Sequence, residues 1–169
     1  TLLVFGAGAL GLLWAATARA RGVPAVVAAR GNGRRLEIAR GYGARTVDLG
    51  REEPDSADPA DMAVDCTGDP DVWRRLADLV VPGGKVLLFG GCAPGATATW
   101  DAARLHYSEI SLLGSFHYTP EEARDALEML ASGEIDPRPL LSGRGPLSEL
   151  PRFLDAQERR EGIRYAVFP

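Results

Sequence analysis

A glycine-rich stretch near the start of the chain has the spacing that binds phosphate groups. Gly6, Gly8 and Gly11 stand in the order G-x-G-x-x-G, directly after the apolar run 1–5. The first glycine permits a tight turn, the second lets the backbone approach a pyrophosphate, and the third lets the following helix pack closely on the strand. The phosphates would then meet the partial positive charge at the helix N-terminus. We therefore expect a dinucleotide to bind at Gly6, Gly8, Ala9, Leu10 and Gly11.

The segments around these glycines support this interpretation. The helix-favouring segment 12–19 follows them and ends near Gly22, and a second apolar strand is expected over 25–29. Strand, glycine turn, helix and second strand are the context in which the motif indicates a dinucleotide site. The alternative is a glycine-rich turn between a strand and a helix that has only a structural role.

The end of the second expected strand indicates which dinucleotide binds. An NAD site places an acidic residue there to accept hydrogen bonds from the adenosine ribose, whereas an arginine accommodates the 2′-phosphate of NADP. The chain has Arg30 at this position, with Asn32 and Arg35 shortly after it. We therefore expect NADP, with NAD as the alternative cofactor, and we expect Arg30→Asp to reverse the preference. These arginines could instead form a solvated helix face.

Composition excludes several other classes of function. The 169 residues are enough for one domain with a substantial core, and the net charge of −4 argues against a nucleic-acid partner. No apolar run is long enough to span a membrane, and no signal peptide is apparent. Two cysteines, Cys66 and Cys92, do not make a disulfide framework, so we expect a cytoplasmic protein.

The order of elements predicts an α/β fold. Further strands are expected over 44–47, 62–66, 85–89 and 110–115, with helices over 34–40, from Pro70 to Leu79 and over 101–107. We expect Pro82, Gly83 and Gly84 to end the helix that Pro70 begins. Repeated strand–helix alternation indicates a parallel sheet, so the prediction is a Rossmann-type, doubly wound parallel sheet of about six strands.

The last third of the chain is expected to form an extension of this sheet domain. Thr119, Pro120 and Glu122 predict a helix start with a capping box, and Gly133 its end. That helix is expected to direct Ala123, Ala126, Leu127 and Leu130 inward. A Pro-rich segment over 137–146, a helix over 150–160 and a last strand over 163–168 follow. We therefore divide the chain into a dinucleotide-binding domain, 1–118, and a C-terminal extension, 119–169.

Five motifs together resemble a known superfamily. They are the glycine turn 6–11, Asp65-Cys66-Thr67-Gly68, the segments 82–90 and 106–115, and the closing residues 162–167. Their order and spacing are similar to the coenzyme-binding half of the medium-chain dehydrogenase/reductases. Within it, the chain most resembles the zinc-dependent alcohol and polyol dehydrogenases of the sorbitol and threonine dehydrogenase type.

The resemblance implies hydride transfer between a nicotinamide cofactor and a secondary alcohol or polyol. It places Arg30, Asn32 and Arg35 around the adenosine ribose, and Thr67 and Gly68 on the adenine-ribose side. For Thr67 a hydroxyl bonded only within the protein is the alternative. The resemblance also places the following residues near the nicotinamide: Phe89, Gly90, Gly91, Leu113 and Ser115.

The resemblance also implies that the catalytic residues and the zinc lie in a separate, mostly-β domain that this sequence does not contain. The chain begins inside its first strand, so we expect it to be part of a longer polypeptide. Its own metal-ligand candidates, Cys66, Cys92, His106 and His117, lack the close spacing of a zinc site, and we predict no metal here. The family usually has a crossover helix where this chain has the short acidic loop 48–61.

Two other functions remain open. The chain could be a nucleotide-binding regulatory module without catalysis, or part of a zinc-independent quinone or enoyl reductase of the same superfamily. In each case the expected partner is a small molecule. Because segment 110–115 is apolar and expected at a sheet edge, we also expect a homodimer or homotetramer through that strand.

Overall fold

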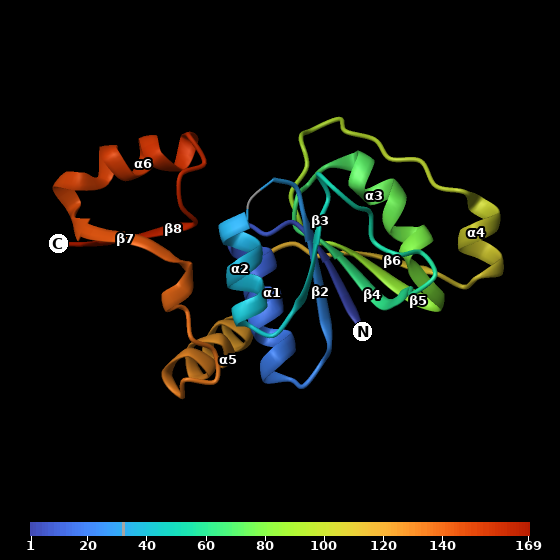
Figure 1. Cartoon of the computed structure of the whole chain (residues 1–169), viewed down its shortest axis with the longest axis horizontal. Helices are drawn as coiled ribbons and strands as arrows, with labels where there is room; N and C mark the ends of the chain where they lie inside the picture. The colour runs from blue at the N-terminus through green and yellow to red at the C-terminus, as the bar shows by residue number, and fades with distance from the viewer. Residues whose placement is uncertain (32) are drawn as a thin grey trace.

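A parallel sheet of six strands forms the centre of the molecule. The structure is a computed structural model that describes residues 1–31 and 33–169. The strands are β1 (Leu2–Phe5), β2 (Ala25–Ala29), β3 (Arg45–Asp48), β4 (Ala60–Asp65), β5 (Val80–Leu88) and β6 (Ser111–Gly114). They lie in the order β3-β2-β1-β4-β5-β6 (Figure 1). The predicted six-stranded parallel sheet is therefore confirmed. The strand order reverses between β1 and β4, and in such sheets the ligand crevice lies at that point, beyond the carboxyl ends of the strands.

Helices cover both faces of this sheet. Helices α1 (Ala9–Ala20) and α2 (Gly33–Gly41) lie on one face, and α3 (Pro70–Leu76) and α4 (Ala102–Tyr107) on the other (Figure 1). Successive residues of a strand point to opposite faces, so Val4 packs with the α1 and α2 layer while Phe5 packs with the α3 layer. Both side chains are fully buried. A strand buried on both faces reads as a continuous apolar run, which is why 1–5 was recognisable.

The fifth strand begins earlier than the sequence predicted. Pro82, Gly83 and Gly84 were expected to end a helix, but they lie inside β5, while the helix ends in the short 3-10 turn Ala77–Leu79. In the pairing of β4 with β5, Ala60 lies opposite Val80 and Met62 lies opposite Lys85. The register shift between these two pairs leaves Pro82, Gly83 and Gly84 in a bulge of β5. Gly83 has φ of +77°, which a glycine adopts without strain.

The C-terminal residues form a small unit beside the first two helices. It contains α5 (Pro120–Ala131), β7 (Leu141–Pro146), α6 (Leu150–Glu158) and β8 (Arg164–Phe168), with short 3-10 turns at Arg138–Leu140 and Leu147–Glu149. Strands β7 and β8 pair with each other in parallel, apart from the main sheet (Figure 1). Strand β7 was not predicted, because its Gly and Pro residues resemble a loop. The acidic stretch between β3 and β4 is a loop, as expected.

Apolar residues from this unit join the core of the α1 and α2 layer. Ile135, Leu140 and Ile163 are buried in the same cluster as β1 and α1. The Tyr42 hydroxyl at the end of α2 donates a 2.7 Å hydrogen bond to the Asp136 carbonyl. The division at residue 118 therefore runs through a shared core, and the two-part division itself stays a prediction.

The predicted inward face of α5 is wrong. Its N-terminal capping box is present, with Thr119 and Glu122 bonded reciprocally. However, Ala123, Ala126, Leu127 and Leu130 are exposed, and Leu127 keeps 66% of its surface accessible. The helix contacts the core chiefly through Met129, which packs partly buried against the α1 and α2 layer. An amphipathic pattern reports which face is apolar, and here no described segment covers that face.

Candidate functional site: a cleft at the carboxyl ends of the parallel strands

The glycine turn connects β1 to α1, and its three glycines have different structural roles. Gly6 has φ of +101°, and its N–H donates to the Ala28 carbonyl at 2.8 Å. A Cβ on Gly11 would lie 1.8 Å from the Gly6 carbonyl oxygen, so only glycine lets α1 start this close to β1. A Cβ on Gly8 would meet no described atom within 4 Å. Folding therefore requires glycine at position 11, while Gly8 borders open space beside the helix N-terminus.

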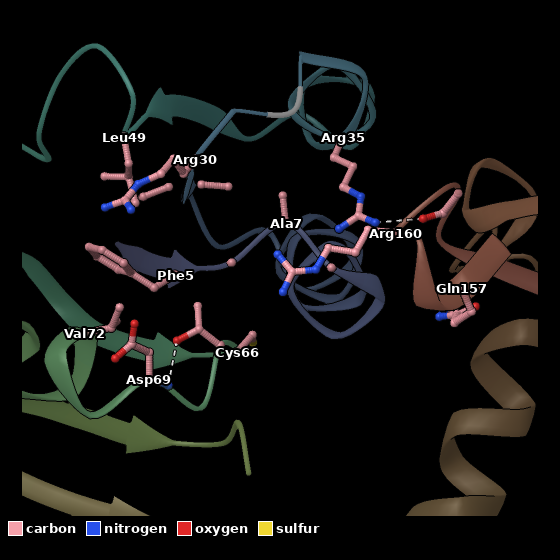
Figure 2. A pocket seen from close by; sticks show the side chains of 16 residues that line it. Phe5, Ala7, Arg30, Arg35, Leu49, Cys66, Asp69, Val72, Gln157 and Arg160 are labelled. Atoms are coloured by element: carbon pink, nitrogen blue, oxygen red, sulfur yellow. Dashed lines mark hydrogen bonds between the residues drawn. The ribbon is translucent and has the colours of Figure 1, made fainter. Parts of the chain in front are cut away.

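A cleft of about 600 Å³ opens directly beside this turn. Its walls come from the glycine turn, the carboxyl ends of β2 and β4, and a segment after α6 (Figure 2). Gly8, the N-cap residue of α1, has no side chain, so a ligand can approach its backbone closely. The N-terminus of the helix supplies N–H groups and the positive end of the helix dipole. The residues present therefore fit the phosphates of a dinucleotide.

Asp65 organises the second wall. Its carboxylate is fully buried at the end of β4, and one oxygen accepts hydrogen bonds from the Thr67 N–H (3.0 Å) and hydroxyl (2.5 Å). The other oxygen accepts from the Gly68 N–H and the Trp73 indole N–H, both at 2.8 Å. Four donors satisfy the buried charge and fix the Thr67–Gly68 turn against α3. The sequence prediction did not assign Asp65 to the site.

Thr67 lines the cleft, but its hydroxyl is engaged within the protein. It donates to Asp65 and accepts a 3.1 Å hydrogen bond from the Asp69 N–H. These bonds match the alternative interpretation of Thr67, a strand-end hydroxyl bonded inside the chain. Contact between Thr67 and a ligand stays a prediction. Asp69 is the N-cap of α3, where its carboxylate accepts a hydrogen bond from the Asp71 N–H at 2.9 Å, and it also lines the cleft.

The two cysteines have different environments. Cys66 lies at the base of the cleft, half-buried, and burial together with the neighbouring Asp65 charge raises the pKa of its thiol to about 12. It is therefore protonated near neutral pH and is a poor nucleophile. Cys92 is exposed, and neither cysteine is in a disulfide.

Arginines stand on two sides of the cleft. Arg30 follows β2, and its guanidinium extends toward Leu49, whereas Arg35 reaches down from α2 on the side of the C-terminal segment (Figure 2). Arg35 donates a 2.7 Å hydrogen bond to the Gly162 carbonyl, so it also holds the C-terminal unit to α2. Asn32, the third predicted residue of this group, lies outside the described residues. Its predicted role, like those of the two arginines, stays a prediction.

The predicted residues that follow β4 and β5 pack against one another. Gly68 and Gly91 are in contact, since a Cβ on Gly68 would lie 1.9 Å from the Gly91 carbonyl oxygen. A Cβ on Gly90 would lie 2.4 Å from the Gly68 nitrogen, and the Phe89 ring meets the Trp14 ring edge-to-face with centroids 5.7 Å apart. The turns after β4 and β5 are thus brought together.

The other predicted residues are placed by their elements. Ala9, Leu10 and Gly11 form the first turn of α1. Leu113 lies on β6 and Ser115 directly follows that strand, and both side chains are exposed. Strand β6 pairs with β5 alone among the described strands, which confirms its predicted place at the sheet edge. Ligand contacts of all these residues stay predictions.

Several lining residues were not predicted. Leu49 and Val72 add apolar walls, Asp69 lines the cleft as described above, and Gln157, Arg160 and Gly162 come from the C-terminal segment. The others lie on or next to predicted strands or the glycine turn: Phe5, Ala7, Ala28, Ala29 and Cys66. Leu49 lies one residue past the end of β3, and residues at the carboxyl ends of parallel strands are expected to line a ligand crevice. Its role in the cleft could therefore have been predicted from the sequence. The C-terminal residues are remote in sequence, and only the tertiary structure brings them to the glycine turn.

No zinc site is formed by the described part of the chain. Residues 1–31 and 33–169 contain no group of three His, Cys, Asp or Glu side chains arranged to hold a metal ion. Cys66, Cys92, His106 and His117, the four candidates considered from the sequence, are therefore not part of such a group. Within the same residues, no helix is both long and apolar enough to cross a membrane.

Comparisons with known proteins identify a family and solved structures with the same fold. The profile of the zinc-binding dehydrogenase family matches residues 9–132. D-altritol 5-dehydrogenase of Agrobacterium fabrum is 37% identical over 153 residues, which are 89% of this chain and 45% of that protein. The chain spans about half the length of the curated relatives it matches.

Two solved structures share the fold over nearly the whole chain. L-idonate 5-dehydrogenase of Escherichia coli superposes with a TM-score of 0.86 at 26% identity, over 99% of this chain and 49% of that one. A protein of Sinorhizobium meliloti, described as a zinc-binding dehydrogenase bound to NADP, superposes with a TM-score of 0.92 at 24% identity, over 100% and 52%.

Proposed function

This chain belongs to the zinc-binding dehydrogenase family, and on that premise we propose that its cleft binds a nicotinamide dinucleotide, with NADP preferred, for an alcohol or polyol oxidoreductase. The observation that supports this proposal most strongly is the difference between Gly8 and Gly11 in the turn after β1. Gly11 is required by packing, whereas Gly8 leaves open space where a pyrophosphate would approach the N-terminus of α1.

The chain's own residues would bind and orient the cofactor. When bound, the nicotinamide supplies or accepts the hydride. The backbone N–H groups at the start of α1 hold the pyrophosphate, and Leu49 and Val72 form apolar walls in the part of the cleft toward which Arg30 extends. Phe89, Gly90 and Gly91 would border the nicotinamide, because the turn after β5 packs against the turn after β4.

The preference for NADP rests on Arg30. Its guanidinium lies at the end of β2 and lines the cleft, where an NAD site would place a carboxylate. A guanidinium fork suits a 2′-phosphate and cannot accept hydrogen bonds from ribose hydroxyls.

Calorimetric titration of this chain with NADPH and NADH, before and after Arg30→Asp, tests this preference. The parent should bind NADPH more tightly, and the variant should bind NADH more tightly. Because the variant replaces an attraction to the 2′-phosphate with a repulsion, we expect the ratio of the two affinities to change by about 100-fold. An unchanged ratio would refute the role of Arg30.

The reaction and its substrate are inferred from the relatives. The curated relatives include D-altritol 5-dehydrogenase and D-arabinitol dehydrogenase, so we propose hydride transfer to or from a secondary alcohol or polyol. Catalytic groups would come from a partner domain that this sequence does not carry, with any zinc bound there. Large apolar side chains on the surface support such a partner domain, which would cover them. Phe116, Leu127 and Leu147 are each more than 60% exposed.

Exposed apolar residues are also relevant to the expected oligomeric state and to the division of the chain into two parts. We propose that 119–169 packs on the partner domain and that the chain forms a homodimer or homotetramer through the free edge of β6. The edge carries Leu112 and Leu113, with no charged side chain between Ser111 and Gly114. A monomer by light scattering at high concentration would contradict the assembly. A cytoplasmic location is proposed from the two cysteines, neither of which is in a disulfide.

A further inference from the structure

The end of helix α6 contains an arginine at a position that normally requires glycine. After the C-cap Arg159, the backbone of Arg160 turns to φ of +58°, in the left-handed region. The Arg160 N–H donates to the Gln157 carbonyl at 3.0 Å, and the Glu161 N–H donates to the Ala156 carbonyl at 2.8 Å. These two bonds define a Schellman motif, in which the left-handed residue is usually glycine because a Cβ is unfavourable there.

The side chain at this strained position lines the nucleotide cleft. Figure 2 shows the Arg160 guanidinium extending from the C-terminal segment toward Ala7, within the glycine turn. No described residue forms a hydrogen bond or ion pair with it. Its neighbour Arg159, by contrast, is paired with Glu161 at 3.0 Å. The arginine therefore has backbone strain and no compensating bond within the described chain, a combination typical of a ligand-binding residue.

The Schellman bonds hold Arg160 to the end of α6, and two further contacts anchor the backbone that follows it. Arg35 donates to the Gly162 carbonyl at 2.7 Å, which ties this segment to α2. The Ile163 N–H donates to the Ser142 hydroxyl at 2.8 Å, and the Ile163 side chain is buried. The backbone of Arg160–Gly162 is thus fixed over the cleft before any ligand arrives, so little backbone entropy would be lost when Arg160 binds an anion.

We propose that Arg160 binds the pyrophosphate of the dinucleotide and so makes the C-terminal unit a wall of the cofactor site. The proposal rests on the proposed function. The direction of the side chain selects the pyrophosphate over the 2′-phosphate, because Arg160 points to the glycine turn while Arg30 extends toward Leu49 on the other side (Figure 2). Arg160 would place a positive charge opposite the N–H groups of α1, so two elements about 150 residues apart would hold one anion.

The substitution Arg160→Gly separates binding from folding. Glycine relieves the left-handed strain and removes the guanidinium, so the thermal midpoint should equal or exceed that of the parent. The affinity for NADPH and for NADH should each fall about tenfold or more, since the pyrophosphate is common to both. Arg160→Lys, which keeps the charge but loses the fork, should restore part of the affinity for both.

Arg159→Gln is the matched control, because it removes the same charge one residue away, from a side chain that does not line the cleft. It should change neither affinity by more than about twofold. If the parent binds neither dinucleotide, the proposed function fails. If the parent binds and Arg160→Gly binds equally well, or loses NADPH affinity alone, the assignment of Arg160 to the pyrophosphate is overturned. A lower midpoint with weaker binding would also overturn it, because the role would then be structural.

Discussion

Two glycines of the turn after β1 provide the sharpest separation of folding from binding. Gly8→Ala adds a methyl group that meets no described atom within 4 Å, and residue 8 has an extended backbone, φ −77°, that alanine adopts without strain. Gly11→Ala places its methyl 1.8 Å from the Gly6 carbonyl oxygen. The same chemical change therefore fills open space at one position and overlaps backbone at the other.

The distances set the expected magnitudes. At Gly8 the loss of a favourable N-cap residue and the gain in backbone rigidity nearly cancel, so the unfolding free energy should change by less than about 0.5 kcal/mol. At Gly11 the start of α1 must move away from β1 by about 1 Å or more to relieve the overlap. Such overpacking costs about 3 kcal/mol, which corresponds to a fall of about 6–12 °C in the thermal midpoint of a domain of this size.

Thermal melting and dinucleotide titration of both variants test this reasoning. Gly8→Ala should melt like the parent and bind NADPH at least tenfold more weakly, because the methyl occupies the space the pyrophosphate needs. Gly11→Ala should be clearly destabilised. Full NADPH affinity in a folded Gly8→Ala variant would refute the placement of the phosphates. A Gly11→Ala variant as stable as the parent would refute the packing account.

The remaining predictions concern the second wall of the cleft. Asp65→Asn replaces one carboxylate oxygen with an amide NH₂, which then faces N–H donors that it cannot accept from. The substitution should lower the unfolding free energy, measured by urea melts, by about 3 kcal/mol. A change below about 0.5 kcal/mol would contradict the bonding described. Because the pKa of Cys66 is raised to about 12, its reactive thiolate is scarce below that pH and increases only as pH approaches it. Iodoacetamide at about pH 8.5 should therefore label exposed Cys92 and spare Cys66 until the chain is unfolded, and equal labelling of both cysteines in the folded chain would show this to be wrong.

Much of the sheet domain could be predicted because its signals are local. The run at 1–5 is apolar throughout since a central parallel strand is buried on both faces. Asp69 before Pro70, and Thr119 before Glu122, mark helix starts through bonds that span only two or three residues. The glycine turn combines such local signals, so its place between β1 and α1 was also readable.

Features that depend on distant contacts could not be predicted. The bulge at Pro82 resembles a helix stop, and only its partner strand β4 reveals that β5 has already begun. The apolar face of α5 was assigned to the core because periodicity identifies a face but not what covers it. Arg160 was missed since nothing in its neighbours indicates that it faces a turn near residue 7.

The central claim is that a nicotinamide dinucleotide binds with its pyrophosphate beside Gly8. A crystal structure of this chain grown with saturating NADPH tests it most directly. The account predicts the pyrophosphate between the N-terminus of α1 and the Arg160 guanidinium, the adenosine between Arg30 and Val72, and the nicotinamide toward Gly91. Phosphates bound elsewhere, or a cleft that stays without the dinucleotide at that concentration, would contradict it.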